Sequence, residues 1–462
     1  MSARHGSSLL PVHREISVSD VFILAWPIMV SMLSRTAMTT ADSLFVGQLG
    51  TTPMAAVGLG GVATWFGLSF GMGLLSSVQV SVAKRVGAAR FEVVRRLLWQ
   101  GLWLALAVGV PVALAGYSGP LLFPLMGAGP EATELASSYF SITMLGAPLT
   151  FVNVALMGWF QGRGDTRTPM VATVGANLLN IALDPLFIFG WGPVPAGGMP
   201  GAAIATVLSV GVSVAFLAWR AWPMAGALVR PIPALLRSMW RVGFPVGVQW
   251  TLDVASFLAF VSVLAHAGEA HLAAHVIAIR IVSISFLPGH AAGEAAGVMV
   301  GQALGSKRPE KAREAWRAGT RLAVLVMASA SLFFVISPTT LVSLFGAEEQ
   351  VLYIGGSLVL VAAGFQIFDG VAMVALSALR GAGDTRWPMV VCALSSWLIK
   401  IPAGVLLALP LGLGAAGAWM GLTVEIAVLA ALAVWRIQGT RWLTVSSPAP
   451  RKRTRVKAVA AA

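Results

Sequence analysis

The sequence predicts an all-α polytopic membrane protein with twelve transmembrane helices, arranged as two pseudo-two-fold-related lobes of six helices each. Composition is the first reason. Hydrophobic residues make up 57% of the chain, charged residues 11%, and the mean hydropathy is +0.83, whereas soluble domains carry about 25% charged residues. An internal duplication and an alternating distribution of basic residues are the second and third reasons.

The duplication is clearest in an octapeptide. The sequence G-R-G-D-T-R-T-P at Gly162–Pro169 returns as G-A-G-D-T-R-W-P at Gly381–Pro388, an offset of 219 residues in a chain of 462. Other matched positions, such as Gly87 and Gly305, are 218 apart. Two diverged halves that enclose one central cavity are a common plan for secondary transporters.

Each expected helix is an apolar stretch of sufficient length. Crossing the hydrocarbon core of a bilayer takes roughly 20 apolar residues. Such stretches lie near residues 18–46, 54–82, 97–116, 132–160, 168–190 and 201–221 in the first copy, and near 242–265, 272–302, 320–337, 350–379, 387–410 and 414–435 in the second.

Basic residues alternate between the two ends of these spans. Of 31 Lys and Arg residues, 28 lie before the first span, after the last span, or in the loops that follow the second, fourth, sixth, eighth and tenth spans. The loops that follow the odd-numbered spans contain none. Since cytoplasmic loops collect Lys and Arg, we expect a multi-pass plasma (inner) membrane protein with both termini cytoplasmic. Arg4 and the tail Arg451–Lys457 are then topology determinants that face anionic lipid, and we expect no nucleic-acid partner.

These features divide the chain into five parts. Prolines in the segment Arg220–Arg241 disfavour a continuous helix and favour a semi-rigid connection between the lobes. The expected parts are a cytoplasmic N-terminal segment (1–17), an amino lobe (18–221), an inter-lobe linker (222–241), a carboxyl lobe (242–436) and a basic cytoplasmic tail (437–462).

Nine charged residues fall inside the spans, where charges are costly enough to imply a role or a partner. Acids outnumber bases by six to three, so at least three acids need a proton or an exchangeable cation. The bases are Arg35, Arg280 and Lys400, and the acids are Asp42, Asp184, Asp253, Glu294, Asp369 and Glu425.

Three polar residues in the fifth span share one helical face. Asn177, Asn180 and Asp184 stand at i, i+3 and i+7, which places them on one stripe toward the bundle interior. Amide oxygens and a carboxylate are hard ligands suited to Na⁺, and a carboxylate in an apolar cavity also suits H⁺. Hydrogen bonding between helices is the alternative role for either Asn alone.

Seven short motifs together resemble the multidrug and toxic compound extrusion (MATE) family, and the resemblance covers roughly residues 15–440. Their order and spacing carry the resemblance, because no single motif is decisive. They are A-W-P-I-M at Ala25–Met29, A-D-S-L-F-V-G at Ala41–Gly47, the paired G-D-T-R motifs, N-x-x-x-D-P at Asn180–Pro185, G-A-A-I-A-T at Gly201–Thr206, A-A-H at Ala273–His275 and V-G-Q-A-L-G at Val300–Gly305.

The resemblance implies two lobes that alternate access across the membrane, and it assigns candidate residues. The amino-lobe cation site falls on Asp42, Asn180, Asp184 and Thr206, with a backbone oxygen from Ala202. Pro27 resembles the proline at which the first helix bends, and loss of a backbone hydrogen bond there permits a kink. Cavity candidates are Asn153, Asn177, Asp253 and Asp369.

The expected function is secondary antiport that exports organic cations or drugs in exchange for H⁺ or Na⁺. We expect no cofactor and no enzymatic activity. The expected partners are a small-molecule substrate and the lipid bilayer, and the protein is expected to be a monomer. Members of the family usually emphasise the acids of one lobe, whereas this chain has Asp42 and Asp184 in one lobe and Asp253 and Asp369 in the other. Asp253 also stands where the family frequently has Glu, so the coupling ion stays open. A flippase for lipid-linked sugars, or an organic-acid exporter of the same superfamily, is the alternative.

Several other motifs receive a structural interpretation. An intramembrane aspartyl protease is disfavoured because no Tyr precedes an Asp. His290 and Glu294, one helical turn apart, are either a proton-responsive pair or a hydrogen-bonded pair. For His266, His271 and His275 we expect no metal, since His275 belongs to the A-A-H motif.

Overall fold

The structure is a computed structural model that describes residues 14–444. Arg4 and the basic tail from Arg451 onward therefore lie outside the described residues. Apart from a single bridge between Trp191 and Val194, regular structure in the described range is helical. This confirms the all-α membrane fold expected from composition.

Both halves of the chain contain long helices. Those of the first half are α1 (Val18–Gly47), α2 (Thr51–Gly87), α3 (Phe91–Ala115), η1 (Gly116–Ser118), α4 (Gly119–Leu125), α5 (Pro130–Leu145), α6 (Ala147–Gly162), α7 (Arg167–Phe189) and α8 (Gly198–Ala225). Those of the second half are α9 (Pro233–Ala267), α10 (Glu269–Gly305), α11 (Pro309–Ile336), α12 (Pro338–Ser343), α13 (Glu349–Gly381), α14 (Arg386–Ser395), η2 (Ser396–Lys400), α15 (Ile401–Ala408), α16 (Gly414–Gln438) and α17 (Arg441–Thr444).

The membrane spans agree with the sequence prediction. In the described range, eleven helical spans are long and apolar enough to cross a bilayer. The pair α5 and α6, which the sequence predicted as one span at 132–160, bends by 46° at Gly146 and brings the number to twelve. Gly146 is followed by Ala147 and Pro148 at the start of α6, where a proline lacks the N–H that would continue the helix.

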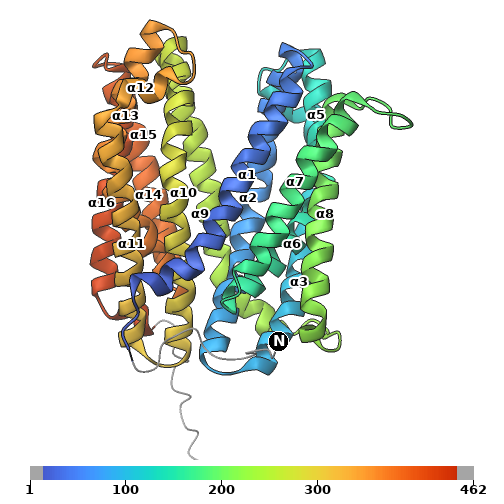
Figure 1. Ribbon diagram of the computed structural model, residues 1–462, viewed down its shortest axis with the longest axis vertical. Helices are drawn as coiled ribbons and strands as arrows, with labels where there is room; N and C mark the ends of the chain where they lie inside the picture. Colours follow the sequence, from blue (N-terminus) through green and yellow to red (C-terminus); the bar gives the residue numbers. More distant parts are fainter. Residues whose placement is uncertain (1–13, 445–462) are drawn as a thin grey trace, which may run out of the picture.

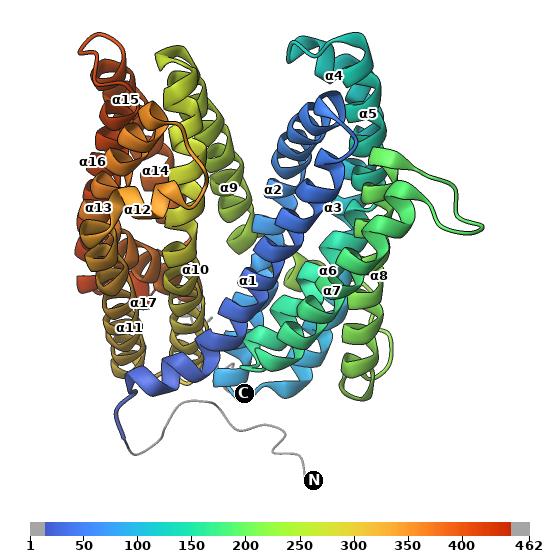
Figure 2. The ribbon, with the colours of Figure 1, turned by 45° about the horizontal axis from the view of Figure 1, so that its top comes forward.

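The helices form two bundles that meet at one end and diverge toward the other (Figure 1). One bundle contains α2 to α8 and the other α9 to α16, and the same arrangement is visible after rotation (Figure 2). The two ends of the described chain meet at the start of α11. There Lys311 Nζ donates to the Arg14 carbonyl at 2.8 Å, and Arg313 donates to the Gly439 carbonyl at 3.3 Å. Both ends of the described chain therefore belong to the end where the bundles converge.

Helix α1 packs on both lobes. Its early residues Val21, Leu24 and Ile28 share a buried cluster with alanines of α10 and α11 in the carboxyl lobe, whereas Val46 near its end packs with Ile188 of α7 and Ala202 of α8 in the amino lobe. The first turns of α1, which the sequence assigned to an amino lobe over 18–221, therefore pack against the carboxyl lobe. Figure 2 shows α1 changing direction as it passes from one bundle to the other.

Pro27 lies between these two parts of α1. Its nitrogen carries no hydrogen, so the carbonyl one turn earlier loses its helical hydrogen bond. Four residues later, the buried Ser31 hydroxyl donates to the Pro27 carbonyl at 2.8 Å, a type of bond that favours bending of a helix. The sequence Pro-x-x-x-Ser therefore accounts for a weak point where α1 leaves the carboxyl lobe.

Where the lobes meet, the contacts repeat the internal duplication. A side chain at Gly87 would overlap the Gln302 carbonyl, and one at Gly305 would overlap the Lys84 carbonyl. Gly87 and Gly305 are 218 residues apart, and so are Lys84 and Gln302. In addition, Gln302 donates to the Gly162 carbonyl at 3.1 Å and Lys84 Nζ to the Ala382 carbonyl at 2.7 Å. Each lobe thus contacts the octapeptide repeat of the other through equivalent positions.

The connection between the lobes is shorter than the 222–241 segment expected from sequence, because α8 continues to Ala225 and α9 begins at Pro233. Its backbone is fastened to α3. The fully buried Gln100 side chain donates to the Arg230 carbonyl at 3.1 Å and accepts from the Ile232 N–H at 2.6 Å. Trp103 donates to the Val229 carbonyl at 3.0 Å. The connection is therefore held along the amino lobe.

Candidate functional site

Helices α1, α7 and α8 bring the amino-lobe candidates together. On α7, Asn180 and Asp184 are completely buried and Asn177 is nearly so, as expected for one stripe that faces the interior of the bundle. Asp42 comes from α1, and Thr206 from the helix that follows α7. The residues span positions 42 to 206, so the cluster depends on the packing of α1 and α8 against α7.

Asn180 occupies the centre of this cluster. With its amide oriented to satisfy both neighbours, its nitrogen lies 2.9 Å from Asp42 Oδ1 and its oxygen 3.2 Å from the Thr206 nitrogen. The Thr206 hydroxyl donates to the Ala202 carbonyl at 3.0 Å. Asn180 thus connects the carboxyl group of α1 to the backbone of α8, and four of the five predicted cation-site residues share one hydrogen-bonded chain.

The fifth residue, Asp184, lies beside Asp42, close enough for the two carboxyl groups to share a hydrogen bond. Both Asp184 oxygens are buried, and apart from the neighbouring Asp42 carboxyl no group of residues 14–444 is placed to donate to them. No basic side chain of this range interacts with either acid. Ionised carboxylates only accept hydrogen bonds, so this pair needs a proton or a cation between its oxygens.

Tyr139 on α5 is an addition that the sequence did not indicate. It is close enough to Asp42 and Asp184 to interact with both electrostatically, and it packs against Gly60 of α2. Its closeness depends on the fold of α5 against α2, and a single Tyr in an apolar span carries no signal of such a contact.

The remaining amino-lobe candidates make other contacts. Asn177 donates to the Ser34 hydroxyl of α1 at 2.9 Å, which adds a second link between α7 and α1. Asn153 on α6 accepts from the Ser213 hydroxyl of α8 at 2.9 Å and is buried. Neither Ser34 nor Ser213 was indicated by the sequence, because serine occurs throughout the spans. Asn153 therefore contacts α8 away from the Asp42 cluster.

A second acidic group lies in the carboxyl lobe. Asp253 on α9 accepts from Gln249 at 3.4 Å. Glu425 on α16 lies close enough to both Asp253 and Asp369 for their negative charges to repel one another. Sequence reasoning assigned no role to Glu425, and its position between two predicted cavity residues follows from the packing of α16 against α13.

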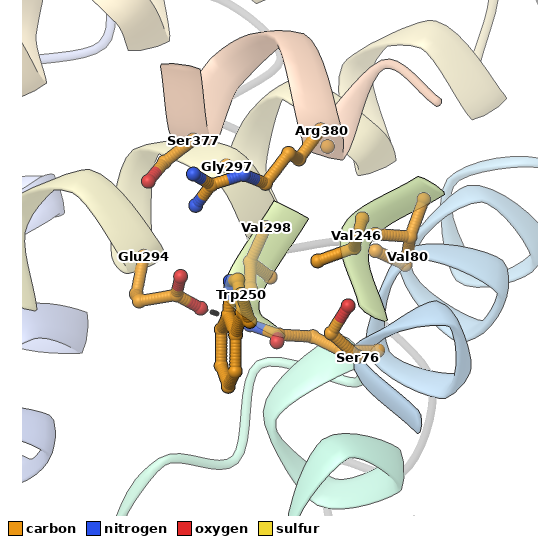
Figure 3. A pocket seen from close by; sticks show the side chains of 12 residues that line it. Ser76, Val80, Val246, Trp250, Glu294, Gly297, Val298, Ser377 and Arg380 are labelled. Carbon is orange, nitrogen blue, oxygen red and sulfur yellow. Dashed lines mark hydrogen bonds between the residues drawn. The ribbon is translucent and has the colours of Figure 1, made fainter. Parts of the chain in front are cut away.

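A pocket separates the lobes near their convergent end. Figure 3 shows the Glu294 carboxylate and the Arg380 guanidinium directed into it from different helices. Gln79 of the amino lobe donates to Glu294 at 3.2 Å. Within the described range, Nδ1 of His290 and Nε of Arg380 are buried without a hydrogen-bond partner. The lining includes Ser76, Gln79, Val246, Trp250, Glu294, Val298, Ser377 and Arg380.

Two of the three clustered histidines anchor helix ends to α16. His271 accepts from the Ala415 N–H at 3.1 Å, and His275 accepts from the Trp419 indole at 3.2 Å. The third, His266, pairs with the Ser262 carbonyl at 2.7 Å. Over the described residues, no group of three or more His, Cys, Asp or Glu side chains has the geometry of a metal site.

Comparison with protein families gives a match to the MatE family model. The match covers residues 27–186 and again residues 245–406. The two matched segments begin 218 residues apart, the offset seen within the sequence. Each half of the chain is therefore one copy of the family unit.

Individual relatives give the same result. A probable multidrug resistance protein NorM of Mesorhizobium japonicum is 31% identical over 442 residues, covering 92% of this chain and 94% of that protein. A Pyrococcus furiosus transporter of the MOP superfamily, whose binding pocket has reversed polarity and suggests a different function, has a TM-score of 0.85 at 26% identity, with 95% and 99% of the chains covered. An outward-facing multidrug resistance MATE family transporter has a TM-score of 0.83 at 25% identity, with 92% and 96% covered.

Proposed function

Because the chain belongs to the MatE family of multi-pass membrane transporters, whose relatives include multidrug resistance proteins, we propose that it exports organic cations in exchange for H⁺ or Na⁺. It is a transporter of the multidrug efflux class and not an enzyme. The identity of the exported compounds and of the coupling ion belongs to the proposal.

The observation that carries the proposal is the Asp42–Asp184 pair. Two neighbouring carboxyl groups, of which only Asp42 receives a neutral donor, from Asn180, and which form no ion pair in the described part of the chain, favour a bound proton or cation. Asp42 belongs to α1, which contacts both lobes. A cation bound between Asp42 and Asp184 therefore couples α1 to α7, and its release allows α1 to change its packing against the two lobes.

The arrangement of the lobes supports alternating access. The convergent end carries basic residues in the last turn of α2 and in the segments that follow α2 and α10, including Arg85, Arg90, Lys307 and Arg308. The positive-inside rule supports a cytoplasmic location of this end, and on that basis we propose that the described conformation is the outward-open one. We propose an inner-membrane location, cytoplasmic termini and a monomer that rocks between outward-open and inward-open states without a cofactor.

Transport measurements with separately imposed gradients test the proposal. The chain is expressed in an efflux-deficient bacterium, and accumulation of ethidium and of norfloxacin is followed with an imposed H⁺ or Na⁺ gradient. We expect lower accumulation in cells with the protein, and further lowering by the gradient of the coupling ion. Equal accumulation with and without the protein, across a broad panel of organic cations, would refute cation export.

The alternative is a transporter for an organic acid or a lipid-linked sugar. Pocket polarity differs among the structural neighbours, since the Pyrococcus furiosus transporter has a binding pocket of reverse polarity, and this chain holds Lys400 and Arg380 beside Asp253 in its carboxyl lobe. Uptake of a radiolabelled organic-acid panel into inverted vesicles distinguishes the two. Export of acids without export of any cation favours the alternative.

A further inference from the structure

Lys400 is a buried base in the middle of a membrane span. Its residue is only 8% exposed, and it ends the π turn η2 within the span Arg386–Ala408. An ammonium group in hydrocarbon is costly, and such groups pair with other polar groups or mark a functional site. Single π turns within α-helices are also frequent at functional sites.

Two hydroxyl groups hold the Lys400 ammonium in place. Nζ donates to Ser256 Oγ of α9 at 2.9 Å and to Ser396 Oγ at 3.4 Å. Ser396 in turn donates to Glu425 Oε1 of α16 at 3.1 Å, and Ser256 donates to the backbone carbonyl of Asp253 at 2.9 Å. The ammonium is therefore connected through one serine to each of two carboxyl-bearing helices.

The same ammonium interacts electrostatically with both acids, Asp253 and Glu425. None of the direct ion pairs in the described range includes Lys400, so its ammonium is bonded to hydroxyl groups and acts on the two acids from a longer distance. Two hydroxyl oxygens bond the ammonium directly, and the carboxyl groups of Asp253 and Glu425 act on it from a longer distance. Such hard oxygen ligands also suit a sodium ion.

The amino lobe lacks this feature. No basic group in the described chain interacts with Asp42 or Asp184. The 219-residue offset of the repeat places the counterpart of Asn180, the central residue of the amino-lobe cluster, at Ile399, directly before Lys400. Both lobes thus contain acidic groups, but among the described residues only the carboxyl-lobe group has basic side chains beside it, Lys400 and Arg380.

We propose that Lys400 is a built-in cation that occupies the carboxyl-lobe position between Asp253 and Glu425 and prevents an exchangeable Na⁺ from binding there. The inference deepens the proposed antiport, since it assigns the exchangeable cation to the amino-lobe pair. A fixed positive charge repels a Na⁺ ion that binds next to it. At a separation of about 4 Å in a protein, this repulsion lowers the affinity for Na⁺ by several powers of ten.

Direct Na⁺ binding to purified protein tests the assignment independently of drug export. The background is the full chain in nanodiscs with Asp42→Asn and Asp184→Asn, which removes the amino-lobe pair. Radiolabelled Na⁺ is measured by scintillation proximity. With Lys400 present we expect no saturable binding. Lys400→Met, which keeps length but removes the charge, should bind Na⁺ at least about a hundredfold more tightly, and adding Asp253→Asn should abolish this binding.

Lys400→Arg is the matched control, because it retains the positive charge and should bind no Na⁺. Saturable binding in the background protein that Asp253→Asn or Glu425→Gln removes would overturn the proposal, and this measurement needs no change at Lys400. A monodisperse Lys400→Met protein that gains no Na⁺ binding would overturn it equally. Failure of the cation-export assay, in contrast, leaves these binding results unchanged.

Discussion

At the scale of single residues, the amino-lobe cluster combines acids that only accept hydrogen bonds with an amide that connects them to α8. Asn180 supplies one donor to Asp42 and accepts from the Thr206 backbone. Apart from the Asp42 carboxyl, no group of the described chain is placed to donate to Asp184. Asp42 therefore has one neutral partner, and the shared proton or cation decides the charge of the pair.

Asp42→Asn should retain folding and substrate binding but lose gradient-driven export, because an amide neither releases a proton nor adds a charge for Na⁺. Ethidium accumulation with this variant should equal that of cells without the protein. Glu131→Gln, an exposed acid at the start of α5, is the control and should export normally. Wild-type export by Asp42→Asn in both H⁺ and Na⁺ gradients would transfer the coupling role to Asp253 and Asp369.

Ser213→Ala should destabilise the amino lobe by about 0.6–2 kcal/mol, the range for hydrogen bonds between membrane helices, because it removes the donor to the buried Asn153 oxygen. Thermal unfolding in detergent measures the loss. Ser329→Ala, an exposed serine bonded only within its own helix, should change the midpoint little. An unchanged midpoint for Ser213→Ala together with altered drug selectivity would favour Asn153 as a substrate contact.

The sequence predicted part of this residue-level detail. Asn177, Asn180 and Asp184 share a face because helical periodicity alone places them there, and the family resemblance added Asp42 and Thr206. The closeness of Tyr139 to the two acids, and the serines that hold Lys400, follow from packing between helices. A π turn such as η2 shifts the register of one span by a residue, and composition carries no sign of it.

At the scale of elements, α1 has two parts that rest on different lobes. A rigid helix fixed at both ends would oppose any relative rotation of the lobes. Pro27 and the Ser31 hydroxyl bonded to its carbonyl leave a weak point between the two parts. The proline predicted as a hinge from sequence thus lies at a position where bending of α1 has a mechanical consequence.

Pro27→Ala should slow export while leaving the protein folded, because a new N–H restores the missing helical hydrogen bond and stiffens α1. Initial rates of ethidium efflux measure the change, and the thermal midpoint should stay equal or rise. Pro111→Ala is the matched control, since Pro111 is also internal to a helix, α3, whose buried residues pack in the amino lobe. Equal efflux rates for wild type and Pro27→Ala would exclude bending at Pro27 as a required step.

At the scale of the whole molecule, closure of the convergent end rests on backbone contacts that the duplication repeats. Gly87 meets the Gln302 carbonyl and Gly305 meets the Lys84 carbonyl. These contacts need the absence of side chains and no particular charge. The duplication was evident in the sequence, but the pairing of each G-D-T-R turn with the opposite lobe depends on the two-fold arrangement of the halves.

A disulfide across this end should lock the lobes in the described arrangement. Ala88 lies against Gly305, so we expect Ala88→Cys with Ser306→Cys, in a Cys392→Ala background, to crosslink and to block export until a reductant is added. If the crosslinked protein exports at the rate of its reduced form, the lobes do not separate here during transport.

Gly87→Ala should weaken that crosslink, because its methyl group would overlap a backbone carbonyl that cannot rotate away. The measured quantity is the crosslinked fraction after a fixed oxidation time. Gly58→Ala should leave the fraction unchanged. Gly58 lies on the same helix, and apart from its own chain neighbours and the local helix backbone no atom of the described chain lies within 4 Å of the added Cβ. An unaltered fraction for Gly87→Ala would show that the lobes tolerate the added methyl group at this contact.

The fastened connection before α9 limits what kind of movement the carboxyl lobe can make. Ile232, the residue before α9, is bonded to Gln100 of α3, so the chain has no slack at this point. Two bodies joined without slack at one point cannot slide past each other there, although they can turn about it. Gln100 therefore marks a fixed point near the convergent end of the lobes (Figure 1), and a small rotation about it moves the diverging ends of the helices over a long distance.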